Sequence, residues 1–399
     1  MKRIVSLITV IAMLFTLCVA FAGCGKTQTG TEGSDDIKIG FIFLHDENST
    51  YDKNFIDAAN AAKEALGLRD DQILFKTNIP ESSECYEAAA ELVDSGCKLV
   101  FADSFGHEDF MIQAAKEFPD VVFCHATGTK AHTENLPNFF NAFASIYEGR
   151  FLAGVVAGLK LNEMLESGEI TEAKMGYVGA FPYAEVKSGY TSFFLGARYV
   201  CLSVTMDVKY TNSWFDIAAE KETANALIAG GCVLISQHAD SEGAPKACEE
   251  AGVPNVAYNL DTREWGPNTA LVSSKINWEP YFEHIINAVK DGKDIEQDFC
   301  KGLKDDVVQL IGLNEDVVAK GTDEKVEEVK AKLMAGEIKV FDTSTFTVEG
   351  KTLTEYKADV DSDAAFTPDT DVVSDGYFHE SEYRSAPYFD IVIDGITEK

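Results

Sequence analysis

The sequence predicts an α/β protein made of two doubly wound lobes joined by a hinge. From residue 37 onward, short apolar runs rich in β-branched and aromatic residues alternate with helical patterns. Continuous apolar strands separated by helices are typical of a parallel sheet that helices cover on both faces. The chain of 399 residues also exceeds what one hydrophobic core usually serves. So many β-α units in a chain of this length indicate two sheets rather than one.

The alternation is clearest in four pairs of elements. The apolar runs cover residues 37–44, 97–103, 174–181 and 231–240, and the helical patterns after them cover 55–66, 111–118, 186–200 and 243–252. Each run has the length and composition of a strand, and each pattern has apolar residues at helical spacing.

The same rhythm predicts where the lobes divide. We expect changes of lobe near residues 140 to 150 and again near 260. The expected ranges are 37–141 plus 262–295 for the N-terminal lobe and 142–261 plus 296–340 for the C-terminal lobe. The acid-rich, aromatic-spotted extension 341–399 lacks a helical period and indicates either a short β-rich cap or a partly ordered tail.

The N-terminus has the pattern of an export signal, with a basic start, a long apolar run and small residues before Cys24. A membrane-spanning anchor would also fit the length of the apolar run. The motif "FAGC" resembles a bacterial lipobox, with Phe21 at the place where leucine is usual. We therefore expect a signal peptide over 1–23, a lipid on Cys24, a flexible Gly/Thr/Ser-rich tether over 24–36, and attachment to the extracytoplasmic face of the cell membrane.

Charge and cysteine content exclude several classes of function. The chain has 34 basic and 66 acidic residues and a net charge of -32, which repels nucleic acid. Cysteines other than Cys18 and Cys24 form an odd set that indicates no full disulfide framework, namely Cys85, Cys97, Cys124, Cys201, Cys232, Cys248 and Cys300. Neither C-x-x-C nor H-E-x-x-H occurs, so we expect no metal and no cofactor.

The loops after the strands are the expected place for a ligand, because ligands bind at the carboxyl ends of strands in open α/β sheets. These loops are mostly polar with single aromatic residues, which suits a site with flat walls and hydrogen-bonding edges. They are "HDENSTYDKNF" (45–55), "DSFGHEDF" (103–110), "HATG" (125–128), "GAFPYAEV" (179–186), "TNSWFD" (211–216), "HADSEG" (238–243) and "NLDTREW" (259–265).

Several longer blocks resemble one family. They are "YDKNF" (51–55), "DSFGHEDFMIQAAKEFPDVVF" (103–123), "YEGRFLAGVVAG" (147–158), "YVGAFPYAEVKSGYTSFFLGAR" (177–198), "TNSWFD" (211–216) and "YNLD" (258–261). In this order they resemble the basic membrane protein family, over roughly residues 37–340. The resemblance implies a lipoprotein of the type I periplasmic binding protein fold. It also implies a monomer that serves an ABC transporter permease and binds a purine base or nucleoside.

The resemblance also implies which residues hold the purine. "DKNF" matches the family's D-K-S-F and gives Phe55 on one lobe, and "TNSWFD" gives Trp214 on the other, as the two aromatic rings that sandwich the base. The alternative is that both rings anchor the core. Asp261 in "YNLD" matches the family's base-contacting acid, and Asn259 belongs to the same block.

Polar residues at other strand ends are further candidates for the purine's edge: Asp46, Asp103 and His238. An aspartate there can equally cap the following helix, which is our preferred interpretation for Asp52. Two departures from the family remove polar partners, because Ile56 stands where many members have asparagine and Ile276 where they have a ribose-contacting lysine. The stretches "HADS" (238–241), "YNLD" (258–261) and "NWEPYF" (277–282) also resemble a branch of the family with more apolar pockets that suits free purine bases. This resemblance favours a free base such as adenine over a nucleoside.

Rival functions are judged by the motifs that they require. An exported hydrolase is disfavoured, because neither G-x-S-x-G nor G-x-x-x-x-G-K occurs and abundant acids alone are no evidence for paired catalytic carboxylates. We therefore expect no enzyme. A receptor of the same fold for a sugar or a flavin, or one that signals instead of feeding an importer, stays open. In each case we expect the lobes to close around the ligand by a hinge motion.

Overall fold

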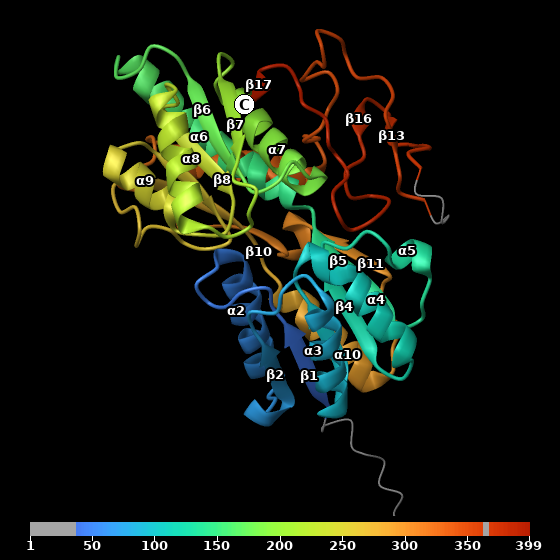
Figure 1. The fold of residues 1–399 in the computed structure, drawn as a ribbon. Helices are drawn as coiled ribbons and strands as arrows, with labels where there is room; N and C mark the ends of the chain where they lie inside the picture. Colours follow the sequence, from blue (N-terminus) through green and yellow to red (C-terminus); the bar gives the residue numbers. More distant parts are fainter. Residues whose placement is uncertain (1–36, 362–366) are drawn as a thin grey trace, which may run out of the picture. The chain divides into compact units, whose positions relative to one another are not determined.

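The computed structural model describes residues 37–361 and 367–399, and two main β-sheets dominate it (Figure 1). Both sheets are mostly parallel and carry helices on both faces, so the predicted doubly wound α/β class is confirmed. The expected signal peptide, the lipidation site Cys24 and the tether lie outside the described residues. None of the helices that the structure describes is long and apolar enough to cross a membrane.

The first sheet has six strands in the order β11-β5-β4-β3-β1-β2, and all neighbouring strands run parallel. Helices α2 and α10 pack on each other at one face, and α3 and α4 pack on each other at the opposite one. The strands are β1 (Lys38–Ile42), β2 (Ile73–Lys76), β3 (Cys97–Ala102), β4 (Val122–Ala126), β5 (Phe139–Ala144) and β11 (Asp298–Lys301). The helices are α2 (Thr50–Ala65), η2 (Asp70–Gln72), α3 (Ser83–Asp94), η3 (Phe105–His107), α4 (Glu108–Glu117), α5 (Ala131–Glu134) and α10 (Glu279–Asp291).

The second sheet has seven strands in the order β12-β10-β9-β8-β6-β7-β17, and only the β10–β12 pair is antiparallel. Its strands are β6 (Lys174–Gly179), β7 (Thr205–Tyr210), β8 (Leu234–His238), β9 (Asn255–Tyr258), β10 (Ala270–Ile276), β12 (Val308–Ile311) and β17 (Ile396–Glu398). The helices beside it are α6 (Ile146–Glu166), α7 (Ala184–Val200), α8 (Ile217–Ala229), α9 (Gly243–Ala251), η4 (Leu303–Asp305) and α11 (Thr322–Ala335).

Two glycines allow α6 and α7 to pack unusually close together. A Cβ on Gly154 would collide with the backbone oxygen of Phe193, and a Cβ on Gly196 would collide with that of Phe151. Only glycine permits such an approach of two backbones. The tight pair buries most of both helices and forms the firm support from which α7 presents its first turn to the site described below.

The division between the lobes differs from the expected ranges at two strands. β10 lies in the seven-stranded sheet, although 262–295 was assigned to the N-terminal lobe, and β11 lies in the six-stranded sheet, although 296–340 was assigned to the C-terminal lobe. The chain therefore passes between the sheets three times, after β5, after β10 and after β11. The sheet to which β10 and β11 belong is decided by pairing with strands that are distant in the sequence. A local apolar pattern therefore cannot predict it.

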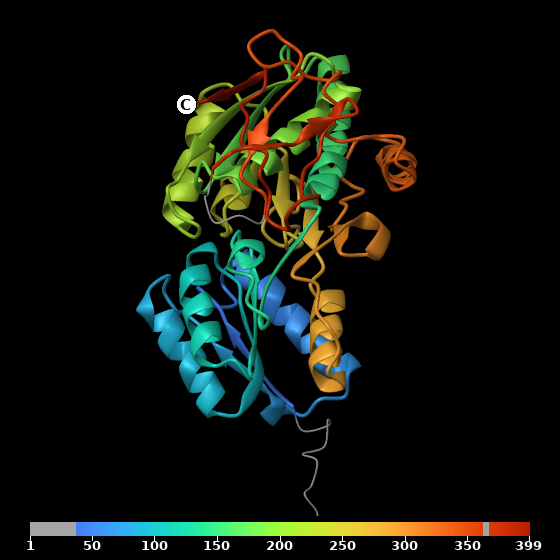
Figure 2. The ribbon, with the colours of Figure 1, turned by 90° about the vertical axis from the view of Figure 1, so that its right-hand side faces the viewer.

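The described part of the C-terminal extension is mostly irregular, with a few very short strands, and it packs beside the lobe that contains the seven-stranded sheet (Figures 1 and 2). Its short strands are β13 (Lys357–Ala358), β14 (Thr370–Asp371), β15 (Val373–Ser374) and β16 (Tyr377–Phe378). β13 pairs with β14, and β15 pairs with β16. Its last strand, β17, pairs with β7 and completes the edge of the seven-stranded sheet. Both interpretations of the extension, a short β-rich cap or a partly ordered tail, stay predictions.

Candidate functional site

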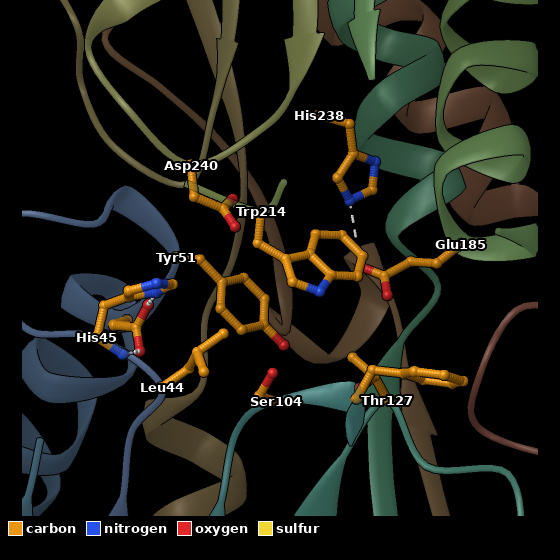
Figure 3. Close-up of a pocket in the computed structure, with 11 residues that line it drawn as sticks. Leu44, His45, Tyr51, Ser104, Thr127, Glu185, Trp214, His238 and Asp240 are labelled. Atoms are coloured by element: carbon orange, nitrogen blue, oxygen red, sulfur yellow. Dashed lines mark hydrogen bonds and ion pairs between the residues drawn. The ribbon is translucent and has the colours of Figure 1, made fainter. Parts of the chain in front are cut away.

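A pocket lies where the carboxyl ends of strands from both sheets converge (Figure 3). It encloses about 350 Å³ of empty space, part of which is open to solvent. The lining residues follow β1, β3 and β4 in the first sheet and β6, β7 and β8 in the second. They are Leu44, His45, Tyr51, Asp52, Ser104, Phe105, Thr127, Glu185, Trp214, His238 and Asp240.

Two aromatic side chains from different sheets face this pocket. Tyr51 lies in the first turn of α2, where its hydroxyl donates a hydrogen bond of 2.9 Å to the backbone oxygen of Asp103. Trp214 follows β7 and contacts Phe181 and Tyr183 at interplanar angles of 65° and 51°. Because neither neighbour stacks flat on the indole, a broad face of Trp214 stays available to a ligand.

The loop that carries Trp214 is fixed by its backbone. Asn212 adopts a left-handed conformation at φ 58°, which asparagine tolerates better than most residues. The loop is tied to the sheet by hydrogen bonds of 2.9 Å from the Thr211 and Asn212 N–H groups to the oxygens of Gly179 and Ala180. Asp216 then caps α8 by accepting from the N–H of Ala219 at 2.9 Å. The sequence "TNSWFD" is therefore a turn that presents an aromatic ring at the sheet edge.

Two acidic groups and a histidine line the side of the pocket that the second sheet provides. His238 and Glu185 lie 3.1 Å apart, and burial lowers the pKa of His238. Asp240 is 4% exposed, and burial together with the charge of Glu220 raises its pKa well above the usual value. In the described part of the chain no hydrogen bond reaches the Asp240 carboxyl oxygens. Figure 3 shows this carboxyl group directed toward Trp214 and Tyr51.

The first sheet contributes polar groups that are mostly already engaged. Asp52 accepts hydrogen bonds from the N–H of His45 at 2.7 Å and from the hydroxyl of Ser49 at 2.5 Å. The N-cap of α2 is Ser49, whose hydroxyl accepts from the Asp52 N–H, so the preferred interpretation of Asp52 as the cap is wrong. Thr127 is different, because its hydroxyl is buried without a partner among the described residues and its φ is 65°. A β-branched residue in that conformation is strained, and such strain is typical of binding sites.

Direct contacts join the two sheets beside the pocket. The Thr50 N–H donates to the backbone oxygen of Asp240 at 2.8 Å. The Asn54 amide donates to the backbone oxygen of Ile276 at 2.8 Å and to the side chain of Asn259 at 3.3 Å. The described conformation is therefore one in which both halves of the site contact each other.

Among the residues predicted for the site, Trp214 and His238 line the pocket, whereas Phe55 does not. Phe55 is fully buried and stacks on Trp278, with 4.5 Å between the ring centroids. Its other neighbour is Tyr51, one helical turn earlier, at 4.9 Å in an edge-to-face arrangement. Residues four apart share one face of a helix, and the first of the pair reaches the strand ends while the second reaches the core. The predicted stacking role of Phe55 is corrected accordingly.

The other predicted residues also lie outside the pocket lining. Asp103 lies just behind it, fully buried, with its carboxylate accepting from the Leu44 N–H at 3.2 Å. Asp46 closes a surface turn with Asn48 at 2.7 Å. Asn259 bridges to Asn54, as described above, and Asp261 pairs with Arg263 at 2.5 Å on the surface. None of these four side chains is therefore among the groups that line the site.

Sequence reasoning missed Tyr51, Glu185, Asp240 and Thr127 as residues of the pocket, although it selected every loop that contains them. The position of these loops after the strands was enough to predict the region of the pocket. Which side chain of each loop points inward depends on the helix phase and on backbone conformations such as that of Thr127.

Metal ligands and disulfides do not contribute to the described site. Within residues 37–361 and 367–399, no group of three or more histidine, cysteine or acidic side chains could hold a metal ion. The cysteines of these residues are free thiols, and most of them are buried. The side chains that line the pocket offer aromatic faces and hydrogen-bonding groups.

Comparisons with known proteins agree with this geometry. A sequence model of the family described as "ABC transporter substrate-binding protein PnrA-like" matches residues 42–344. A purine-binding protein of Brucella abortus is 32% identical over 310 residues, which are 77% of this chain and 83% of that protein. A putative ABC transporter glucose-binding protein of Haloferax volcanii is 34% identical over 213 residues, but these are only 53% of this chain and 51% of that protein. An ABC transporter solute-binding protein of Aeropyrum pernix has the same fold, with a TM-score of 0.64 at 19% identity over 76% of this chain and 93% of that one.

Proposed function

Because this chain belongs to the family of PnrA-like ABC transporter substrate-binding proteins, we propose that it captures a purine base or nucleoside, adenine-like by preference, for import. The site that we propose is the pocket between Tyr51 and Trp214. The observation that carries the proposal is the pairing of these two aromatic rings with the unpartnered Asp240 carboxyl group in one small pocket. The purine-binding relative from Brucella abortus supports the same ligand class.

Stacking supplies a large part of the proposed affinity. Every purine offers two flat faces, and a base stacked on an aromatic side chain gains about 1–3 kcal/mol. Tyr51 and Trp214 come from different sheets, so a flat ligand between them contacts both halves of the molecule. Phe55 supports this arrangement from behind, since its ring packs against the edge of Tyr51.

Hydrogen bonding to Asp240 supports a preference for an adenine edge. Burial raises the pKa of Asp240 and so favours the protonated carboxyl group, which offers one donor and one acceptor. Adenine presents a matching pair, the N6 amine as donor and N7 as acceptor, whereas guanine presents two acceptors, N7 and O6, at the same edge. Glu185 and Thr127 provide further groups for the remaining edge atoms.

Capture proceeds by hinge closure in the proposed mechanism. The three connections between the sheets, after β5, β10 and β11, are the segments about which one half turns relative to the other. A ligand shifts the equilibrium toward the closed form only if it binds that form better. Stacking from both halves supplies this difference, and the contact of Thr50 with Asp240 belongs to the closed form.

The remaining parts of the proposal concern cellular context. We propose that the closed protein, as a monomer, presents its ligand to the permease of an ABC importer. The N-terminal sequence supports export and attachment by a lipid on Cys24 at the extracytoplasmic face of the membrane. We assign no catalytic step, because stacking and neutral hydrogen bonds bind a purine without altering it.

Calorimetric titration of the protein from residue 25 onward, unfolded and refolded to remove bound ligand, tests the proposal. The panel is adenine, adenosine, guanosine, hypoxanthine and glucose. We expect micromolar or tighter binding of adenine and weaker binding of guanosine. If only glucose binds, the proposed ligand class changes from a purine to a sugar, which is the ligand in the name of the Haloferax volcanii relative. No binding across the panel would remove the purine proposal and leave the family and fold.

A further inference from the structure

An aromatic contact crosses from one sheet to the other beside the pocket. Phe105 follows β3 of the first sheet, and Tyr183 precedes α7 of the second. Their ring centroids are 5.4 Å apart, with an interplanar angle of 32°. Tyr183 also stacks on Phe181 at 5.2 Å and contacts Trp214 at 6.0 Å. Since opening of the two halves separates the first sheet from the second, the Phe105–Tyr183 contact is present only in the closed form.

One ring of this contact borders the pocket, and both rings are partly exposed to solvent. Phe105 lines the pocket and is nevertheless 40% exposed, and Tyr183 is 42% exposed. The backbone of Phe105 is held from below, because Glu81 accepts hydrogen bonds from the Gly106 N–H at 2.8 Å and from the Ser104 hydroxyl at 2.6 Å. Tyr183 is the N-cap residue of α7, directly before its first turn. Phe105, which borders both the pocket and the solvent, and Tyr183 beside it therefore mark the mouth of the pocket.

The polar groups of the pocket do not offer a second set of partners for a sugar. Asp52 is engaged by His45 and Ser49, and one oxygen of Glu185 is engaged by His238. Asp240, Thr127 and the second oxygen of Glu185 are left for the edge of a base, and the unpartnered Nδ1 of His238 is buried. A ribose attached to that base brings hydroxyl groups that lose hydrogen bonds with water on burial, which is costly without replacement partners.

We propose that Phe105 and Tyr183 form an aromatic gate that closes over a bound free base and excludes the ribose of a nucleoside. This inference rests on the proposed function, because it assumes a purine between Tyr51 and Trp214. The ribose must extend toward the mouth, where the two rings meet, so a nucleoside either prevents the contact or keeps the halves apart. The gate therefore selects the base and slows its release.

The test uses stopped-flow tryptophan fluorescence and calorimetry with adenine and adenosine as probes. The variants are F105A, Y183A and the double variant, with Y183F as the variant that keeps the ring. The matched control is Y199A, since Tyr199 is also 42% exposed but ends the same helix about 25 Å from Tyr183. An aromatic pair contributes enough to change a rate by about 2- to 12-fold.

We expect F105A and Y183A each to raise the dissociation rate of adenine by about 2- to 12-fold and to lower the ratio of the adenosine Kd to the adenine Kd. The double variant should add little to either single change, because both remove one contact, and Y183F and Y199A should match the parent protein. The gate alone would be overturned if the parent protein binds adenine but both alanine variants keep its adenine dissociation rate and its ratio of adenosine Kd to adenine Kd. A parent protein that binds neither probe would overturn the gate together with the purine site.

Discussion

Replacing Trp214 by alanine separates a binding role from a structural role. Trp214 lies in the turn after β7 and lines the pocket with one face. Its neighbours Phe181 and Tyr183 meet it edge-on or tilted, at 5.2 and 6.0 Å, so they support the indole without covering that face. The substitution therefore removes a ligand contact and leaves the turn itself, which is held by backbone hydrogen bonds and the Asp216 cap.

The expected magnitude follows from stacking. Loss of one stacked base contact costs about 1–3 kcal/mol, so the adenine Kd of W214A should rise by about 5- to 160-fold. The stability cost should be smaller than for a core tryptophan. Trp278 is 1% exposed and packed among Phe55, Phe101 and Phe282, and its truncation should cost about 3–5 kcal/mol of unfolding free energy.

Three tryptophan variants measured side by side make the test decisive. We expect W214A to lose affinity with a small change in Tm, and W278A to lose stability. W265A serves as the control, because Trp265 is not part of the pocket lining and should retain parent affinity for adenine. Adenine titration and scanning calorimetry supply both readouts. A large drop in the Tm of W214A with unchanged adenine affinity would show that Trp214 is structural and would refute the reasoning.

Three further predictions concern other parts of the chain. D240N should keep adenine affinity within about threefold, because an amide imitates a neutral carboxyl group, whereas D240A should lose about 1–3 kcal/mol of binding free energy. Calorimetry measures both affinities, and equal losses in the two variants would argue against a protonated Asp240. Burial raises the pKa of Glu380 from 4.5 to about 7, so the native state binds an extra proton between these values and stability falls as pH rises through that window. E380Q should reduce this pH-dependent loss of unfolding free energy by up to about 3 kcal/mol, which is measured as a flatter dependence of Tm on pH. An unchanged dependence of Tm on pH would contradict the raised pKa of Glu380. Deletion of 396–399 removes β17 and the Glu398 carboxylate that accepts a hydrogen bond from Tyr190 at 2.9 Å. Tm should therefore fall while adenine affinity stays constant. Weaker adenine binding would show that the extension contributes to the site.

The sequence determined the architecture and the region of the site. Apolar runs and helical patterns are local properties, and each of the four predicted pairs of run and helix overlaps a strand and the helix that follows it. Parallel connectivity then places the loops after the strands on one edge of each sheet, where the pocket is found. Trp214, which the sequence singled out in its loop, lines the pocket, and its role in binding stays a prediction.

The tertiary structure alone decided which side chains of those loops meet. Tyr51 and Phe55 lie one turn apart on the same face of α2, and only the packing of that helix against Trp278 shows that Phe55 belongs to the core. The exchange of β10 and β11 between the sheets has the same origin in contacts distant along the chain. Local patterns fix which elements form, because they act within a few residues. The direction of a side chain into a shared pocket is fixed by packing between segments that are far apart in sequence.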